Sequence, residues 1–406
     1  MVSALTTSVV TIEEVNELPA DIQSTISVLR QLGVSIEQLN NKLIVHGVGE
    51  RGFTPPTTPI DCGNSGTTAR LLMGILASQQ FSFELIGDAS LSRRPMKRLA
   101  ELLCKNLGAD ITTTNGSLPV TIHGKQLHAG EVILPVASAQ IKSSLLLAAY
   151  TSGVDCIIEE PSQSRDHTEL LFQALGVPVE RSANRISAQT SSEIVLTSEF
   201  SYSIPNDLSA AVFLIVGALI SKKNIRLNDC VLNPTRTAAL DILIASGAPI
   251  FFESVYCKHG ERIGTIIVAG KQASALRSFT INGELIANLQ DEIPALSVLA
   301  MCINGKSIIE DAGELRVKES DRLAVIAKNI RQCGGKVDET SDGLSITGNS
   351  IFVPINVTID TAADHRIAMS FALLSLIGGV QMQIPDPSVV HISYPSFFTA
   401  MDRLTA

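Results

Sequence analysis

The chain has 406 residues, of which 45% are hydrophobic and 17% are charged, and its formal net charge is −9. This length exceeds what one hydrophobic core usually supports, so we expect two domains, and the composition excludes an intrinsically disordered protein. The acidic balance disfavours a general nucleic-acid-binding protein, although a few arginines in one site can still bind small anions.

A helix, a glycine and a strand-like alternation recur along the chain. The five glycines that follow these helices are Gly33, Gly108, Gly176, Gly247 and Gly334. Glycine just past the last helical turn supplies a left-handed cap at low cost. The spacings of 75, 68, 71 and 87 residues are too long for a solenoid. They predict a compact unit of two helices and several strands, repeated about three times per domain; chance coincidence within an α/β protein is the alternative.

The domain boundary is placed where this repeat is interrupted. Pro205 and Asn206 break the pattern, and a buried helix over 208–220 follows, with Asp207 or Ser209 as its N-cap. The sequence therefore predicts domains over 1–204 and 205–406. The last copy of the repeat has only its helix, and the chain opens on the end of a helix and a strand. We therefore expect the first strand or strands of the fold to be missing.

Polar residues gather at predicted helix starts in the first half of the chain. Gly66 stands at the head of an apolar helix, where free backbone N–H groups favour an anion, although a plain N-cap is the alternative. Arg94 precedes Pro95 and is expected at a helix entrance, where its guanidinium can grip a carboxylate or phosphate. Two further helices begin near Gln140 and Arg165, and helix capping alone does not require either residue.

The second half repeats this layout. Asp291 precedes a hydrophobic helix, although an acid there also suits the helix dipole. Lys318, Glu319 and Arg322 fall within one turn if a helix begins near residue 320, and Arg366 stands before another apolar helix. Several helix starts gathered at one site would attract anions strongly, and two anionic substrates fit that better than one.

Neither cross-links nor targeting signals are indicated. The seven cysteines are scattered without C-x-x-C spacing, so we predict no zinc or other metal site and a reduced compartment. Residues 1–19 have no basic region typical of a signal peptide, and the apolar run over 208–220 is too short to cross a bilayer. The cytoplasm is the expected location.

Six of these stretches resemble the motifs of the 5-enolpyruvylshikimate-3-phosphate synthase (3-phosphoshikimate 1-carboxyvinyltransferase) family, in the family's order and approximate spacing. They are GNSGTTARLL, GDASLSRRPM, SAQIKSSLLLA, SRDHTE, LRVKESDRL and DHRIAM. The resemblance implies an α/β (α+β) fold of two globes, each with about three βαβαββ units. It also implies transfer of the enolpyruvyl group of phosphoenolpyruvate to the 5-hydroxyl of shikimate 3-phosphate, with release of phosphate, on the pathway to chorismate and the aromatic amino acids.

The resemblance also assigns residues. Those expected to bind shikimate 3-phosphate are Ser138, Ala139, Gln140, Arg165, Asp291 and Lys318. Those expected to bind phosphoenolpyruvate are Gly66, Arg94, Gln140, Arg322 and Arg366. Asp291 would accept the hydroxyl proton, and Glu319 with Lys318 would serve the proton delivered to, and later taken from, the methylene carbon. The resemblance implies no metal or organic cofactor, no nucleic-acid or membrane partner, and a monomer.

One departure and three alternatives accompany this interpretation. The family's opening P-G-[DS]-K-S segment is not found before the stretch matching Ser3–Val10, so we expect impaired activity. A non-catalytic or weakly active ligand-binding remnant of a synthase is the main alternative. The related transferase acting on UDP-N-acetylglucosamine carries a reactive cysteine that GDASLSRRP lacks. An RNA-end-processing enzyme of related architecture is disfavoured by the acidic balance.

Overall fold

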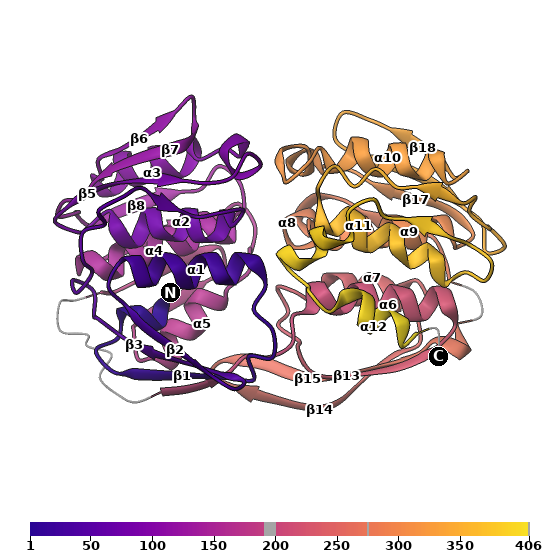
Figure 1. The fold of residues 1–406 in the computed structure, drawn as a ribbon, viewed down its shortest axis with the longest axis horizontal. Coiled ribbons are helices and arrows are strands. Elements are labelled where there is room, and N and C mark those ends of the chain that lie inside the picture. The colour runs from indigo at the N-terminus through magenta and orange to yellow at the C-terminus, as the bar shows by residue number, and fades with distance from the viewer. Residues whose placement is uncertain (191–199, 274–275, 405–406) are drawn as a thin grey trace. The chain divides into compact units, whose positions relative to one another are not determined.

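The computed structural model describes residues 1–190, 200–273 and 276–404. They form two compact units, unit 1 over Met1–Ile204 and unit 2 over Pro205–Ala406 (Figure 1). Each unit has its own cluster of buried hydrophobic residues, and in each unit helices alternate with small sheets. The mixed α/β class predicted from the sequence is therefore confirmed.

Unit 1 contains three four-stranded sheets of one design, in which a parallel pair is followed by two antiparallel pairings. In spatial order the first sheet is β4 (Ile60–Asp61), β5 (Ser82–Ile86), β7 (Ser117–His123) and β6 (Ile111–Thr114). The second is β8 (Gly130–Ile133), β9 (Cys156–Glu159), β11 (Arg185–Ala188) and β10 (Val179–Ser182). The third is β12 (Phe200–Ser203), β1 (Val9–Glu13), β3 (Lys42–His46) and β2 (Ser35–Leu39).

The third sheet joins the two ends of unit 1. β1 runs parallel to β12, with Val10 opposite Phe200 and Glu13 opposite Ser203. An edge strand leaves unpaired N–H and C=O groups, and β12 satisfies those of β1 on one side. The repeat is therefore completed by strands from opposite ends of the unit.

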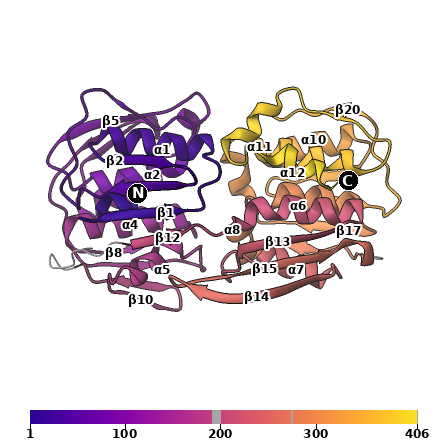
Figure 2. The ribbon, with the colours of Figure 1, turned by 60° about the horizontal axis from the view of Figure 1, so that its bottom comes forward.

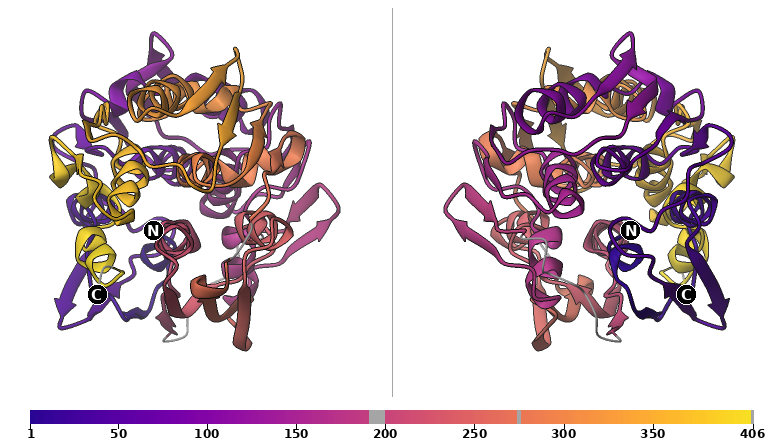
Figure 3. Two further views of the ribbon diagram at one scale, coloured as in Figure 1. Left: turned by 90° about the vertical axis from the view of Figure 1, so that its right-hand side faces the viewer. Right: turned by 90° about the vertical axis from the view of Figure 1, so that its left-hand side faces the viewer.

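Helices lie inside these sheets, as the right-hand view of Figure 3 shows with several of them nearly end-on. The helices of unit 1 are α1 (Ala20–Gln31), α2 (Gly66–Leu76), α3 (Lys97–Leu107), α4 (Ala139–Ser152) and α5 (His167–Ala174). α4 is buried along most of its length, as its apolar sequence requires. A Cβ on Gly74 of α2 would lie 2.0 Å from the Ser144 carbonyl oxygen of α4, so glycine is needed for this close approach.

Unit 2 repeats part of the same design. β16 (Thr280–Ile281) and β17 (Gly305–Ile309) form the parallel pair of a four-stranded sheet that β19 (Leu344–Gly348) and β18 (Lys336–Glu339) complete. β13 (Asn224–Val231), β15 (Glu261–Ala269) and β14 (Ile250–Lys258) form a three-stranded antiparallel sheet, in that order. β20 (Val357–Thr358) and β21 (Met382–Gln383) form a parallel pair.

The helices of unit 2 follow the sequence pattern closely. They are α6 (Leu208–Ser221), α7 (Ala238–Ala245), α8 (Ile286–Leu289), α9 (Ile293–Met301), α10 (Arg322–Gln332), α11 (His365–Ala372) and α12 (Phe397–Asp402). α6 lies along β13 and β15 (Figure 2). Its N-cap is Asp207, whose carboxylate accepts from the Ala210 N–H at 3.1 Å, so of the two predicted caps Asp207 is the correct one.

The five glycines that mark the repeat all have positive φ, between +76° and +95°, which confirms the predicted left-handed turns. Within the described part of the chain, no helix combines the length and the apolar character that crossing a membrane would need.

Candidate functional site

α2 begins with a glycine that faces two guanidinium groups. Ser65 caps the helix by accepting from the Thr68 N–H at 3.2 Å, and Gly66 is the first helical residue. A Cβ on Gly66 would lie 2.9 Å from Nη1 of Arg70 and 3.2 Å from Nη1 of Arg94. The helix start, with its free N–H groups, and the two cations therefore lie together.

Arg94 stands at a helix entrance, as predicted. It follows a short 3₁₀ turn, has extended backbone dihedrals, and lies three residues before Lys97, the first residue of α3. Its Nη2 donates to Asn64 Oδ1 at 2.8 Å and to Ser90 Oγ at 3.4 Å, and Asn64 Nδ2 donates in turn to Asp88 Oδ2 at 2.7 Å. The guanidinium is therefore held in place by side chains that flank the start of α2.

The start of α4 is tied to the start of α2 through Gln140. Gln140 Oε1 accepts from Arg70 Nη1 at 2.8 Å, and its Nε2 donates to Thr67 Oγ1 at 2.8 Å. Ser138 caps α4 by accepting from the Ile141 N–H at 3.4 Å. We call Gly66, Arg70, Arg94 and Gln140 the unit 1 cluster; it joins three of the predicted residues to Arg70, which the sequence reasoning missed.

The start of α5 lies beside the same end of α4. The hydroxyl groups of Ser143 and Thr168 hydrogen-bond at 2.7 Å, and Lys142 Nζ donates to the Ser164 carbonyl oxygen at 3.3 Å. Arg165, partly buried, follows Ser164 in the loop before α5. Three helix starts of unit 1 are therefore linked, which supports the expected attraction for anions.

In unit 2, Arg322 is surrounded by three carboxylates. Its Nε donates to Asp364 Oδ2 at 2.9 Å, its Nη2 donates to Glu319 Oε2 at 2.7 Å, and its Nη1 lies 3.5 Å from Asp291 Oδ1. The side chain is only 1% exposed. Such charge-assisted hydrogen bonds fix the direction of the guanidinium as well as its charge.

Asp291 lies between two arginines. Besides Arg322, Arg366 Nε approaches Asp291 Oδ1 at 3.3 Å, and Arg366 Nη1 donates to the Asp291 carbonyl oxygen at 3.3 Å. Asp364 caps α11 by accepting from the Arg366 N–H at 2.9 Å. We call Asp291, Glu319, Arg322, Asp364 and Arg366 the unit 2 cluster.

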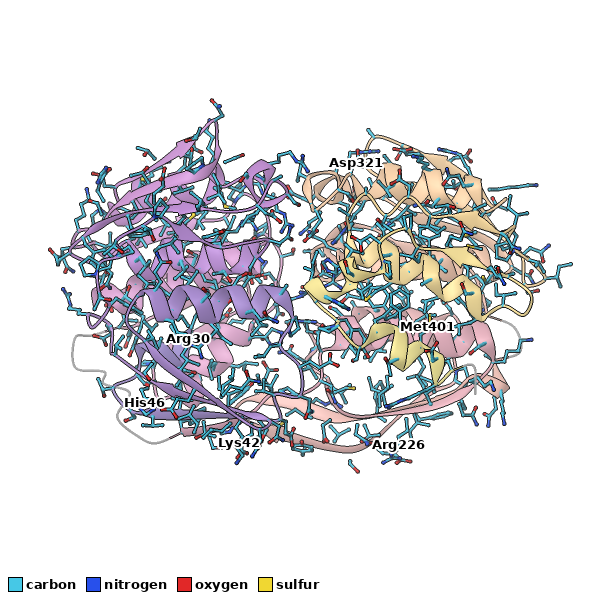
Figure 4. The ribbon with its side chains drawn as sticks, in the orientation of Figure 1. Arg30, Lys42, His46, Arg226, Asp321 and Met401 are labelled. Atoms are coloured by element: carbon cyan, nitrogen blue, oxygen red, sulfur yellow. The ribbon has the colours of Figure 1, made fainter. Side chains whose placement is uncertain are left out.

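The turn that carries Lys318 and Glu319 is not helical, which corrects the sequence expectation. α10 begins at Arg322, with Asp321 as its N-cap (Figure 4 labels Asp321 on this turn). Arg316 Nη1 donates to both Asp321 oxygens at 2.8 and 2.9 Å, while its Nη2 donates to Glu339 and to the Thr340 carbonyl. Lys318 has extended backbone dihedrals, and Asp321 accepts from the Ala324 N–H at 3.1 Å, so α10 begins only at Arg322.

Burial and charge act in opposite directions on the pKa values of the unit 2 cluster. Burial is the largest single influence on Asp364 and would raise its pKa, but the charge of Arg322 and its hydrogen bond, with smaller contributions, together lower that pKa. Burial opposes the charge of Arg322, but the three carboxylates raise its pKa above the usual value. For His365, burial and then the charge of Arg366 outweigh the opposing charges of Asp364 and Glu319 and lower its pKa to about 4. Its imidazole is therefore neutral near pH 7.

Two further predicted residues lie at the ends of elements. Ala139 is the first residue of α4, and Lys318 ends the 3₁₀ turn Gly313–Val317. Among the residues that the structure describes, no group of three or more His, Cys, Asp or Glu side chains is placed to hold a metal ion.

The fold and the two clusters fit an enzyme that acts on small anionic substrates. The family model described as EPSP synthase (3-phosphoshikimate 1-carboxyvinyltransferase) matches residues 1–401. The chain belongs to this family, and the resemblance drawn from the six motifs is confirmed.

Individual relatives agree with this assignment. A protein of Acidithiobacillus ferrooxidans named 3-phosphoshikimate 1-carboxyvinyltransferase is 40% identical to this chain, and the match covers 93% of this chain and 86% of the relative. A protein of the same name in Koribacter versatilis is 41% identical, and the match covers 95% of this chain and 88% of the relative. A solved structure of EPSP synthase from Acinetobacter baumannii has a TM-score of 0.82 and 35% identity, covering 99% of this chain and 91% of its own.

Proposed function

We propose that the chain transfers the enolpyruvyl group of phosphoenolpyruvate to the 5-hydroxyl of shikimate 3-phosphate and releases phosphate. The observation that carries this proposal is the unit 2 cluster, in which Arg322 holds Asp291 and Glu319 within 3.5 Å of its own guanidinium nitrogens. Membership of the family over nearly the whole chain favours this activity over a non-catalytic remnant.

The assignment of residues to shikimate 3-phosphate follows the family motifs. It comprises Ser138, Ala139, Gln140 and Arg165 from unit 1 and Asp291 and Lys318 from unit 2. In unit 1 the support is the linkage of the α4 and α5 starts, since their N–H groups and Arg165 suit a phosphate.

The assignment for phosphoenolpyruvate comprises Gly66, Arg94 and Gln140 from unit 1 and Arg322 and Arg366 from unit 2. The support is geometric within each unit. In unit 1, guanidinium nitrogens of Arg70 and Arg94 lie next to Gly66. In unit 2, Arg322 and Arg366 both approach Asp291. Arginines suit this ligand because a guanidinium binds carboxylate and phosphate groups in two-point fashion.

The reaction requires two proton movements. A bond forms between the 5-oxygen of shikimate 3-phosphate and C2 of phosphoenolpyruvate, while the hydroxyl loses its proton and C3 gains one. The C2–O bond to phosphate then breaks, and a proton leaves the new methyl group to restore the double bond. An acid and a base with fixed positions are therefore needed.

Asp291 and Glu319 take these two roles in the proposal. Asp291 accepts the hydroxyl proton, while Glu319, with Lys318, gives a proton to C3 and later removes one. Arg322 contacts both carboxylates at the same time, so it sets their directions before any substrate arrives. Groups that are positioned in advance need no reorganisation during the reaction, which lowers its barrier.

The test is a phosphate-release assay with the purified chain, shikimate 3-phosphate and phosphoenolpyruvate. We expect phosphate to appear only when both substrates are present, together with the enolpyruvyl product. Omitting shikimate 3-phosphate controls for simple hydrolysis. Binding of shikimate 3-phosphate by calorimetry without turnover would favour the non-catalytic remnant and contradict the transfer.

Three subsidiary expectations have tests of their own. We expect activity to survive exhaustive treatment with a chelator, because no step is assigned to a metal. We expect a monomer in sedimentation analysis, and we expect the tagged chain to locate to the cytoplasm in cells.

A further inference from the structure

Unit 1 contains a buried ionic network that the proposed chemistry does not use. Lys142 of α4 lies 2.8 Å from Glu169 of α5 and 3.4 Å from Glu160, which follows β9. Arg181 of β10 approaches Glu160 at 2.6 Å and Glu169 at 3.6 Å. The Lys142 and Glu160 side chains are fully buried. The network contains two basic and two acidic side chains, each from a different part of unit 1.

This network hydrogen-bonds to Ser164 of the adjacent loop through the N–H, the hydroxyl and the carbonyl group of that residue. Glu160 Oε1 accepts from the Ser164 N–H at 3.2 Å, and Glu160 Oε2 accepts from the Ser164 hydroxyl at 2.6 Å. Lys142 Nζ donates to the Ser164 carbonyl oxygen at 3.3 Å. That carbonyl belongs to the peptide bond that joins Ser164 to Arg165, so the network fixes the plane of this peptide.

Stability alone is a weak reason for such a network. Removing charges from water costs more free energy than a buried ion pair usually returns, and apolar residues of similar volume are often as stable. Lys142 also stands two residues from Gln140, on the first turn of an otherwise apolar helix. The network therefore links the start of α4 to the loop that carries Arg165.

We propose that Lys142 and Glu160 are positioning residues that set the direction of Arg165 for shikimate 3-phosphate. This rests on the proposed function, which assigns Arg165 to that substrate. Lys142 and Glu160 act through Ser164, and the network keeps the loop in one conformation whether or not substrate is present.

The test compares Glu160→Gln and Lys142→Met with the unmodified chain. Glu160→Gln keeps the shape of the side chain but unbalances the network, and one oxygen that accepts from Ser164 becomes an NH₂ group. We expect each variant to raise KM for shikimate 3-phosphate about tenfold or more, because hydrogen bonds to charged groups are lost. KM for phosphoenolpyruvate should change less than about twofold.

Arg185→Met is the matched control. Arg185 pairs with Glu131 at 2.7 Å in the sheet that also contains β9 and β10, but both side chains are about half exposed. Both KM values should stay unchanged in this variant, since an exposed pair contributes little. If Lys142→Met does not fold, the isosteric Glu160→Gln carries the test.

A double-variant cycle separates positioning from a general loss of stability. In an Arg165→Ala background, Glu160→Gln should raise KM for shikimate 3-phosphate no further, because it acts only through Arg165. Additive effects, or a lowered unfolding midpoint with unchanged KM values, overturn the positioning role. Absence of turnover in the unmodified chain instead overturns the proposed function, and the positioning role with it.

Discussion

The unit 1 and unit 2 clusters hold arginines in two different ways. In unit 1, Arg94 and Arg70 donate to amide, hydroxyl and carbonyl oxygens at helix starts. In unit 2, Arg322 and Arg366 are directed by carboxylates. The first arrangement includes neutral oxygen acceptors, whereas the second rests on charge balance and includes Asp291 and Glu319, the carboxylates proposed to carry protons. We therefore expect the unit 1 cluster to fail through small steric changes and the unit 2 cluster through changes of charge.

Arg322→Met should have the largest effect. Removing this cation leaves three carboxylates near one another in a buried place, so we expect a loss of about 3–5 kcal/mol in the free energy of unfolding and no detectable phosphate release. Urea denaturation and the phosphate assay measure the two effects. Arg226→Met, at the exposed pair with Glu253 (Arg226 is labelled in Figure 4), should leave both unchanged. An Arg322→Met chain of normal stability would contradict the charge-balance interpretation.

Asp291→Asn keeps the shape of the unit 2 cluster and removes its proposed base. We expect kcat to fall by about 10² to 10⁴, the usual contribution of a positioned base. The unfolding midpoint should change little, because the amide oxygen can still accept from the arginines. Steady-state kinetics with both substrates measures this. A variant whose KM values rise while kcat is kept would show that Asp291 binds substrate without accepting the proton.

His365 gives the unit 2 cluster a dependence on pH. Its pKa is about 4 in the folded chain against 6.5 in the reference state, so the unfolded chain binds the extra proton as the pH falls. The stabilisation is complete above pH 6.5 and is lost between pH 6.5 and 4, by about 3 kcal/mol in total. Urea denaturation across this range should show a weaker pH dependence in His365→Gln. Identical profiles for both chains would rule out a neutral buried imidazole.

Gly66→Ala tests the unit 1 cluster by shape alone. The backbone there is not left-handed, so alanine is tolerated locally, but the added methyl group would lie 2.9 and 3.2 Å from the nitrogens of Arg70 and Arg94. These flexible groups would shift, and we expect KM for phosphoenolpyruvate to rise about tenfold, since one imperfect charged contact costs about 1.4 kcal/mol. KM for shikimate 3-phosphate should rise less. Equal increases would remove Gly66 from the phosphoenolpyruvate site.

Local features were predictable from the sequence, most clearly around the unit 1 cluster. The glycine turns, the start of α2 beside Gly66 and the position of Arg94 before Pro95 depend on residues close together in the chain. The start of α10 could not be predicted in this way. Arg316, in the turn before α10, donates to Glu339 and Thr340 at the end of β18, and these partners lie far from it in the sequence.

Contacts between elements that are distant in the sequence could not be predicted from it. Arg70 looks like an ordinary residue of an apolar helix until α4 brings Gln140 to it. Lys142 is likewise a single charge in an apolar helix, and its partners come from positions 160, 164 and 169. Pairings of this kind are set by tertiary packing, which leaves no periodic signal in the sequence.

The parallel pairing of β1 with β12 has a consequence for biosynthesis. During translation β1 leaves the ribosome early, but its partner over Phe200–Ser203 is the last strand of unit 1 to be made. The first two sheets use strands close in sequence and can form on the nascent chain, whereas the third must wait for this long-range closure. Until residue 203 has left the ribosome, the edge of β1 that pairs with β12 in the complete unit therefore lacks this partner.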